Sequence, residues 1–537
     1  MRIIKKCATS LLLIASLLSS CHKNNNPYGI RITEELKSMN IIEDNYRNWY
    51  EIYVGSFYDS NSDKQGDLQG VIEKLDYIKD LGFNGIWLMP INKSTSYHKY
   101  DVLDYYEIDS SYGSMNDLEN LISECHKRDI KLILDLVLNH SSLNHPLFSK
   151  SVAAHQKYIS GLTLTAEEEK YKDYYSFYDG DVPPSGYVKV PNHDFYYEAN
   201  FSNDMPEYNC DNPYVREEFQ NIINFYLDKG IDGFRLDAVK YYYLNSKSKN
   251  IELLSKINEW VKAKNKDAYV VGECWETSTS TLSEYYTSGI DSFFNFSCSV
   301  SAPSSYLINS LNLDGKMLNT YYSGLLSNIK MANNHIPAPF LDNHDMPRYT
   351  STGNIKRSKF QYALLQMLNG STFTYYGDEV GIVGTNTGSS PDQDVRIPIK
   401  WGEDKGDCKP PVGTSKTNYV YKDVKTQMND KSSIYNYYKK VLLIRNQNPE
   451  ISRGSPSLLL QDRDNKILAI KKTYQNSEIG IIFNFSPTND LTFNISEYNF
   501  TKVVGQITDN EDYENKYIGQ IDDKIIKLPP YSIVILK

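Results

Sequence analysis

Eight short apolar segments recur along this chain, and segments with a helical pattern lie between several of them. Each apolar segment has the length of a buried strand and is too short for a buried helix. Buried strands that alternate with helices predict a (β/α)8 barrel, in which eight parallel strands close into a cylinder. The predicted strands span 49–54, 85–89, 131–136, 233–236, 269–271, 292–294, 338–341 and 373–376. The clearest predicted helices span 68–81, 115–128 and 215–229.

The rest of the chain does not fit this repeating pattern. A length of 537 residues is too great for one compact core, so we expect smaller units beside a barrel over 40–140 and 205–445. Residues 141–204, between the third and fourth strands, are too many for a simple crossover and predict an inserted lobe. From residue 446 the pattern changes to short alternating segments with turn signals, which predicts a C-terminal antiparallel β-sandwich over 446–537.

Charged residues follow four of the apolar segments. These motifs are DLVLNH at 135–140, GFRLDAVK at 233–240, GECW at 272–275 and FLDNHD at 340–345. A barrel brings the carboxyl ends of all its strands to one mouth, where the reacting groups of barrel enzymes lie. A single such motif is typical of a strand that ends in a solvated polar loop. Four of them in barrel order predict an active site at the mouth.

The four motifs resemble the signature regions of the α-amylase family, glycoside hydrolase family thirteen. The likeness extends to GIWLMP at 85–90, HKYD at 98–101, YYGDEVG at 375–381 and VRIPIKW at 395–401, and it runs from about residue 45 to the end. The resemblance implies a (β/α)8 barrel enzyme that hydrolyses α-glucans with retention of anomeric configuration.

The same resemblance assigns roles to three carboxylates. Asp237 matches the family nucleophile, Glu273 the general acid/base, and Asp345 the third carboxylate, which grips sugar hydroxyls. Crowding of three carboxylates penalises ionising all of them, so we expect a raised pKa for Glu273. Arg235 lies two residues before Asp237 on the same face of the strand and is expected to hold the nucleophile ionised and oriented. The other residues that the resemblance assigns to sugar binding are His98, Tyr100, Asp101, His140, Lys240, His344 and Arg396.

Oxygen-bearing side chains occupy every second position of a segment just after the first strand. This spacing is typical of a calcium loop. It is not an EF-hand, because Lys64 stands at the position of the central glycine and Gly70 at that of the terminal glutamate. It resembles the metal loop of the oligo-glucosidase branch of the family, with Gln65 contributing its main-chain carbonyl; the alternative is an acidic turn. The predicted ligands of Ca²⁺ are Asp59, Asn61, Asp63, Gln65 and Asp67.

The N-terminus has the pattern of an export signal. Positive residues at 2, 5 and 6 precede a short apolar run at 8–18, which predicts a cleaved signal over 1–20. The run ends in Leu18-Ser19-Ser20-Cys21, which resembles the bacterial lipobox, so Cys21 is the predicted lipidation site. The alternative is a plain secretory signal with a chance cysteine. We expect a tether over 21–39 and a bacterial lipoprotein held at the cell surface or in the periplasm through its lipid alone. This arrangement resembles the anchored amylases of bacterial starch-utilisation systems.

Composition narrows the class of partner. A net charge of −10 argues against nucleic acid, because phosphate binding needs clustered lysine and arginine. The cysteines beyond Cys21 are widely spaced and do not form the pattern of a zinc site or a disulfide framework. The expected partner is therefore an α-glucan, and we expect a monomer.

The sequence leaves four functions open. Cleavage of internal α-1,4 bonds in starch-like glucans is favoured by Ala238-Val239-Lys240 after the predicted nucleophile, in likeness to amylases. The HKYD motif also resembles neopullulanases and cyclomaltodextrinases, and an oligo-α-glucosidase is a further alternative within the family. An amylase-like binding protein is the alternative from another class, although such proteins lose catalytic carboxylates and this chain has all three.

Overall fold

The computed structural model describes residues 31–32, 42–303, 305–312, 335–385, 391–415, 421–460, 466–509 and 524–537, with a few more between 320 and 332. The predicted signal over 1–20 and the lipidation site Cys21 lie outside these residues. None of the helices within the described ranges combines the length and apolar character needed to cross a membrane.

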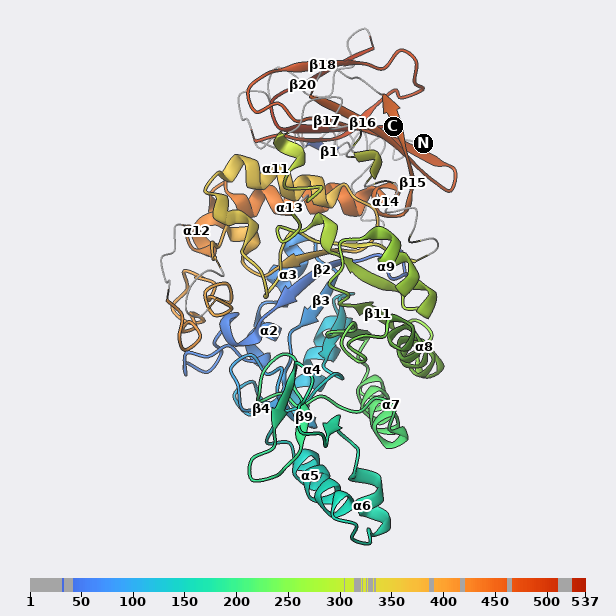
Figure 1. Cartoon of the computed structure of the whole chain (residues 1–537). Coiled ribbons are helices and arrows are strands. Elements are labelled where there is room, and N and C mark those ends of the chain that lie inside the picture. The colour runs from blue at the N-terminus through green and yellow to red at the C-terminus, as the bar shows by residue number, and fades with distance from the viewer. Residues whose placement is uncertain are drawn as a thin grey trace, which may run out of the picture.

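Eight parallel strands form the centre of the molecule and confirm the predicted barrel (Figure 1). They are β2 (Asn48–Ile52), β3 (Gly85–Leu88), β6 (Lys131–Leu136), β10 (Gly233–Leu236), β11 (Tyr269–Gly272), β12 (Ser292–Asn295), β13 (Ala338–Pro339) and β14 (Thr372–Tyr375). Their order in the sheet is β13-β12-β11-β10-β6-β3-β2-β14. A parallel bridge between Phe340 and Phe373 joins the two ends of this order, so the sheet closes on itself.

Helices cover the outside of the barrel. They are α2 (Leu68–Glu73), α3 (Leu75–Leu81), α4 (Met115–His126), α7 (Pro213–Asp228), α8 (Lys247–Lys264), α9 (Thr279–Tyr285), α11 (Ile355–Gln366), α12 (Val424–Asn429) and α13 (Ile434–Gln447). The predicted helix over 68–81 is interrupted at Lys74. At this break the Lys74 ammonium lies over the rings of Tyr58 and Trp401 and pairs with Glu403 at 2.7 Å. A cation–π site that distant residues complete is invisible to a local helical pattern.

The barrel interior changes from apolar to charged along the strands. A cluster that includes Trp49, Ile133, Val271 and Phe373 fills its lower part. Two residues further along three of these strands, on the same face, lie Glu51, Asp135 and Glu273. The strands thus carry packing residues inside the barrel and acidic groups at the mouth, as expected of a barrel enzyme.

Two insertions build walls above the mouth. A hairpin of β4 (Asn92–Ser94) and β5 (Val102–Ile108) follows β3 and carries the HKYD segment between its strands. Between β6 and α7 lies the inserted lobe, with α5 (Pro146–Ile159), α6 (Ala166–Tyr171) and a sheet of β7 (Phe177–Tyr178), β9 (Tyr196–Glu198) and β8 (Tyr187–Lys189). In Figure 1 this lobe lies at the opposite end of the molecule from the C-terminal strands.

The C-terminal unit is an antiparallel sheet backed by a strand pair. The sheet has the order β1-β19-β21-β17-β16-β15, and β18 pairs with β20. Apolar side chains such as Ile482, Phe493, Leu528 and Val534 pack between the two layers. The strand bounds are β1 (Arg31–Ile32), β15 (Ser455–Leu460), β16 (Ile467–Tyr474), β17 (Ser477–Asn484), β18 (Leu491–Asn494), β19 (Val503–Ile507), β20 (Ile525–Leu528) and β21 (Ser532–Leu536).

Two predicted boundaries of this unit are displaced. Residue 446 lies inside α13, and α14 (Pro449–Arg453) follows before the first C-terminal strand begins at Ser455. Part of the predicted tether, Arg31–Ile32, is not free chain but pairs with Gln506 and Gly505 at the edge of the sheet. Both differences arise because a sheet edge and a covering helix are completed by residues far away in sequence, which local patterns do not record.

Candidate active site

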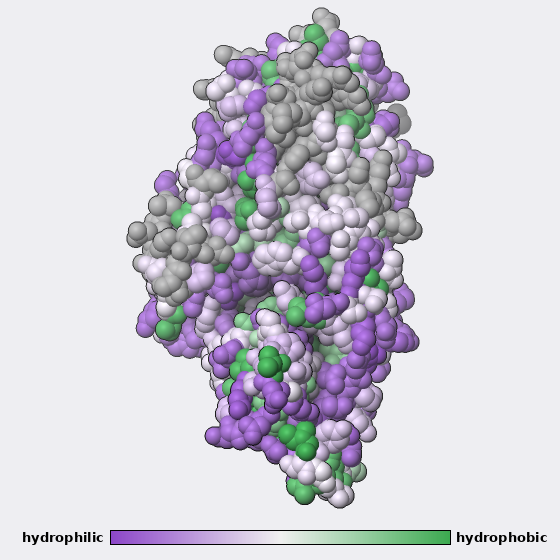
Figure 2. Space-filling view, in the orientation of Figure 1, coloured by the Kyte–Doolittle hydropathy of each residue, from purple (hydrophilic) through white to green (hydrophobic). Residues whose placement is uncertain are grey.

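The mouth of the barrel opens into a cavity of about 510 Å³. Figure 2 shows that the visible face is hollowed where the inserted lobe meets the barrel, and that its surface is mostly hydrophilic or intermediate. The lining combines residues from the strand ends, the β4–β5 hairpin and the inserted lobe, namely His98, Tyr100, His140, Phe201, Ser202, Met205, Asp237, Ala238, Lys240, Tyr241, Glu273, Trp275, Asp345, Asp392 and Arg396. All three predicted catalytic carboxylates therefore face one cavity.

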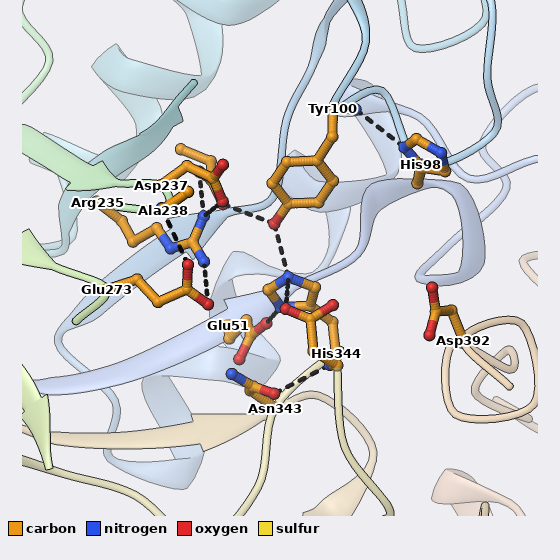
Figure 3. Close-up of polar contacts among 12 residues, drawn as sticks. Glu51, His98, Tyr100, Arg235, Asp237, Ala238, Glu273, Asn343, His344 and Asp392 are labelled. Carbon is orange, nitrogen blue, oxygen red and sulfur yellow. Dashed lines mark hydrogen bonds and ion pairs between the residues drawn. The ribbon is translucent and has the colours of Figure 1, made fainter. Parts of the chain in front are cut away.

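A single guanidinium lies between the two carboxylates expected to react. Arg235 Nη1 donates to Asp237 Oδ1 at 2.6 Å and to Asp135 Oδ1 at 2.7 Å, while Nη2 lies 3.1 Å from Glu273 Oε1 (Figure 3). Arg235 is completely buried, so these contacts are shielded from solvent. The predicted contact between Arg235 and Asp237 is present, and the same side chain also brings Glu273 close to Asp237.

The main chain after Asp237 has an unusual conformation. Ala238 has φ of 49°, in the left-handed region that non-glycine residues rarely adopt. This conformation turns the Ala238 N–H toward Glu273, and it donates to Oε2 at 3.0 Å. The turn that follows the nucleophile position therefore also orients the predicted acid/base.

The pKa of Glu273 is raised to about 8. Burial is the largest cause, Arg235 opposes it, and the neighbouring carboxylates of Asp237 and Asp345 raise it further. The direction agrees with the sequence prediction, but the main cause does not, because desolvation contributes more than carboxylate crowding. Glu273 is consequently protonated at neutral pH and can donate a proton to a leaving oxygen.

Asp345 lies between two positively charged groups. Its Oδ2 is 3.0 Å from His344 Nε2, and its Oδ1 accepts from Arg396 Nη2 at 2.9 Å. Although burial would raise the pKa of Asp345, the charge of His344 and its hydrogen bond lower it below the ordinary range, and Arg396 adds to this effect. Asp345 is therefore ionised across the working range of an enzyme and can accept hydrogen bonds from sugar hydroxyls.

Two histidines line the cavity as neutral donors or acceptors. Burial lowers the pKa of His98 to about 4, and its Nδ1 accepts from the Tyr100 main-chain N–H at 3.1 Å. The proton of neutral His98 is then on Nε2. Burial also lowers the pKa of His140, whose Nε2 is buried and has no hydrogen-bond partner among the described residues. An unpaired buried polar atom on a cavity wall is the feature that a sugar hydroxyl would satisfy.

The remaining predicted sugar contacts divide into two groups. Lys240 and Tyr100 face the cavity, and Lys240 Nζ also donates to the carbonyl of Trp275 at 3.0 Å. Asp101 is not among the residues that line the cavity; its carboxylate accepts the hydroxyls of Ser94, Thr95 and Ser96 and so supports the hairpin, and its contact with sugar stays a prediction. Arg235 and His344 are likewise buried beneath the cavity and act through the carboxylates they contact.

Sequence reasoning missed several residues of the site. Glu51 of β2 is buried, and its Oε1 lies 2.5 Å from His344 Nδ1. A charged residue two positions after a core tryptophan in an apolar strand was the available signal. Phe201 and Trp275 are exposed aromatic side chains on the cavity rim, from the inserted lobe and from the loop after β11. No periodic pattern distinguishes such rim residues from ordinary loop residues.

The residues predicted to bind calcium lie together in the loop between β2 and α2. The Asp59 carboxylate accepts the N–H groups of Asn61, Ser62 and Lys64, and Asp67 caps α2 by accepting from Gly70 at 2.6 Å. Across the part of the chain that the structure describes, no three His, Cys, Asp or Glu side chains are arranged to hold a metal. Oxygen donors suit Ca²⁺ chemically, but a site here would need amide and main-chain oxygens in addition to aspartates.

Comparisons with known proteins agree with this geometry. The family model of the α-amylase catalytic domain matches residues 51–454. The chain is 34% identical to Alpha-amylase 3 of Dictyoglomus thermophilum, over 99% of this chain and 98% of that protein. It is 28% identical to an Oligo-1,6-glucosidase of Parageobacillus thermoglucosidasius, over 91% and 97% respectively. The solved structure of Eubacterium rectale Amy13B superposes with a TM-score of 0.84 and 38% identity, over 93% of this chain and 97% of that one. The chain therefore belongs to the α-amylase family and is a glycoside hydrolase.

Proposed function

We propose that this enzyme is a retaining hydrolase that cleaves internal α-1,4 bonds of starch-like glucans and maltooligosaccharides. The observation that carries the proposal is the single guanidinium of Arg235 that contacts both Asp237 and Glu273. One guanidinium thus holds both carboxyl groups at the mouth, and a retaining enzyme needs its two carboxyl groups near each other, at roughly 5–5.5 Å. A wider separation would leave room for the attacking water of an inverting enzyme.

The proposed reaction has two displacements. The Asp237 carboxylate attacks the anomeric carbon while the bond from that carbon to the leaving oxygen breaks, and protonated Glu273 gives its proton to that oxygen. A glycosyl ester on Asp237 results. Glu273, now a carboxylate, takes a proton from water as the water oxygen attacks the anomeric carbon, and Asp237 is released. Asp345 and the neutral histidines His98 and His140 hold the sugar hydroxyls during both steps.

The preference for longer glucans is supported by the aromatic rim. Trp275 lies two residues after Glu273, and its ring stacks on Phe296 with centroids 4.7 Å apart. Phe201 packs against Tyr241, with ring centroids 4.6 Å apart, and both residues line the cavity. Because Glu273 protonates the leaving oxygen, we expect the nearby ring of Trp275 to contact the leaving part of the chain, where a flat face can stack on a glucose unit.

The test of this specificity is product analysis on amylose, pullulan and isomaltose. The proposed activity gives a range of maltooligosaccharides from amylose at early times and little turnover of isomaltose. Panose from pullulan would instead favour the neopullulanase alternative. Release of glucose alone, with turnover of isomaltose, would favour an oligo-α-glucosidase.

Trp275→Ala is expected to raise KM for maltoheptaose by about 3- to 10-fold, the equivalent of roughly 0.5–1.5 kcal/mol of lost stacking. A short aryl maltoside has a phenol as its leaving group and no glucose unit on that side. Its kcat/KM is therefore expected to change less. Steady-state kinetics on the two substrates provides the measurement. Trp260→Ala, on α8 and absent from the cavity lining, is the matched control. It is expected to leave KM for maltoheptaose and kcat/KM for the aryl maltoside near the wild type. Equal losses on both substrates would contradict stacking at the rim.

We also propose that Ca²⁺ binds the loop of Asp59, Asn61, Asp63, Gln65 and Asp67. At a free calcium concentration of 100 times Kd, binding adds about 2.7 kcal/mol to the free energy of unfolding. At about 2.1 cal/mol/K of unfolding entropy per residue, this corresponds to a rise in Tm of about 2–3 °C for a chain of this length. A chelator is expected to lower Tm by that amount in calorimetry, and added calcium to restore it.

Two variants separate a calcium site from an acidic turn. Asp63→Ala is expected to abolish the response of Tm to calcium. Asp76→Ala removes another exposed aspartate, which pairs with Arg128 instead, and is expected to keep the response. If the chelator leaves the wild-type Tm unchanged, the loop is an acidic turn and not a calcium site.

Export and anchoring through Cys21 are part of the same proposal, supported by the lipobox-like segment at 18–21. In a bacterial host the enzyme is expected in the membrane fraction, because an acylated cysteine adds buried CH₂ groups worth about 0.8 kcal/mol each. Cys21→Ser is expected to move it to the soluble exported fraction, whereas Cys408→Ser leaves it with the membrane. Membrane association that survives Cys21→Ser would exclude the anchor. A monomeric state stays a prediction.

A further inference from the structure

Glu51 is a buried carboxylate that the two-step reaction does not use. It lies on β2 with 1% of its surface exposed, next to Tyr50 and Ile52, which are fully buried. Its Oε1 is 2.5 Å from Nδ1 of His344, a residue 293 positions away in the chain. A charge in such a place is costly unless it is paired, so its pairing with His344 needs a physical account.

The opposite nitrogen of His344 also faces acceptors. Nε2 lies 2.6 Å from the Tyr100 hydroxyl and 3.0 Å from Asp345 Oδ2. The Tyr100 hydroxyl donates its own proton to Asp135 Oδ2 at 3.0 Å, so toward His344 it accepts. A neutral imidazole carries only one N–H, whereas acceptors lie at both nitrogens of this ring. The imidazolium form satisfies both sides at once (Figure 3).

The charged groups around His344 come from several strands of the barrel and from its own loop. Glu51 of β2, Asp135 of β6 and Asp345 of the same loop are acidic. Arg235 of β10 contacts Asp135, and Arg396 contacts Asp345 and donates from Nε to the His344 carbonyl at 3.0 Å. The ring of Trp87 packs edge-on against the imidazole. Burial would lower the pKa of His344, but Asp345 and Glu51 outweigh it and raise the pKa to about 10.

We propose that Glu51 is a positioning residue that keeps His344 doubly protonated, so that Nε2–H stays directed at Asp345 and the Tyr100 hydroxyl. Because Asp345 is held on its other side by Arg396, the imidazolium fixes the carboxylate from two directions. The stacked Tyr100 ring, 5.5 Å from His344 and tilted by 14°, is held by the same contact. The proposal rests on the proposed role of Asp345 and Tyr100 at the sugar, and it does not depend on which glucan is cut.

The direct test is the protonation state of His344, followed by NMR of protein labelled with ¹⁵N at its histidine rings. In the wild type the ring is expected to remain an imidazolium at pH 8. Glu51→Gln keeps a side chain of the same length with an acceptor oxygen but removes the charge. In this variant the pKa of His344 is expected to fall by about 1–3 units. Glu51→Asp retains the charge and is expected to restore most of the shift.

The kinetic readout separates positioning from binding. Glu51→Gln is expected to lower kcat by about 10- to 100-fold, with KM changed less, because a reacting group displaced by about 1 Å costs up to about 100-fold in rate. Glu273 sets the alkaline limb near pH 8 in the wild type. In Glu51→Gln, loss of the His344 proton is expected to add a second ionisation to the alkaline side of the kcat profile.

Glu379→Gln is the matched control. Glu379 is another fully buried carboxylate just after β14, but it accepts hydroxyls of Tyr50 and Tyr77 and has no contact with His344. It is expected to lower stability without moving the His344 titration. A neutral His344 in the wild type at pH 8 would overturn the proposal without any variant, and so would equal shifts in the two Gln variants. Product analysis judges the proposed specificity separately, since it does not involve His344 protonation.

Discussion

Asp237→Asn is expected to lower kcat on maltooligosaccharides by about 10⁴-fold or more, the scale of loss when a catalytic nucleophile is removed. An amide of nearly the same shape cannot form the glycosyl ester. The side chain is still held by Arg235, whose Nη1 lies 2.6 Å from Oδ1, so the site is expected to keep its shape. Steady-state kinetics gives the loss in turnover, and calorimetric titration with maltoheptaose is expected to show binding within a few-fold of the wild type.

The opposite end of the same strand offers the control. Asp232 precedes β10 and contacts His126, Lys131 and the Leu132 N–H, away from the cavity. Asp232→Asn makes the same chemical change and is expected to lower stability while kcat remains near the wild-type value. Turnover that survives Asp237→Asn would exclude the proposed nucleophile, and loss of binding in that variant would mean that the site had been disrupted.

Glu273→Gln is expected to lower kcat on glucans by about 10²- to 10⁴-fold, the contribution of a positioned general acid. Substrates with a phenolic leaving group need little protonation and are expected to lose much less in the glycosylation step. In the wild type, kcat/KM is expected to fall as pH rises through about 8, where Glu273 loses the proton it must donate. The sign follows from the raised pKa, because the required form is the acid and it persists below that pH.

The measurement is a pH–rate profile of wild type and variant on a glucan and on an aryl maltoside. In Glu273→Gln the alkaline limb near pH 8 is expected to disappear from the glycosylation step. Glu276→Gln, three residues on and in contact with Lys240, is the matched control and is expected to keep the limb. An unchanged limb in Glu273→Gln would assign the ionisation to another group and remove Glu273 from the role of acid.

The fold was predictable to the level of its strands. All eight barrel strands occur within about two residues of their predicted positions, because a strand that is buried on both faces consists of consecutive apolar residues. The positions of Asp237, Glu273 and Asp345 at one cavity followed from the rule that parallel strands end at one mouth. The limits of the elements were less predictable. Residue 446 lies within α13, and the helix over 68–81 breaks at Lys74, since packing against distant residues decides both.

The electrostatics of the site were only partly predictable. A raised pKa for Glu273 followed from its chemistry, but its main cause is burial, a property of the folded mouth. Asp101 belongs to a recognisable motif, yet the motif did not reveal that its carboxylate accepts three hydroxyls of the hairpin. Motif membership identified which residues matter near the site but did not decide which way their side chains point.

By itself, the sequence determined the barrel, the four motifs at its mouth and the three carboxylates that face one cavity. These features depend on local periodicity and on a topological rule that holds for every barrel. Only the tertiary structure decided that Arg235 contacts both Asp237 and Glu273. The same holds for the contact between the Glu51 carboxylate and the His344 ring, which are 293 positions apart in the chain. The physical reason is that contacts between residues hundreds of positions apart form when the sheet closes, and no local pattern records them.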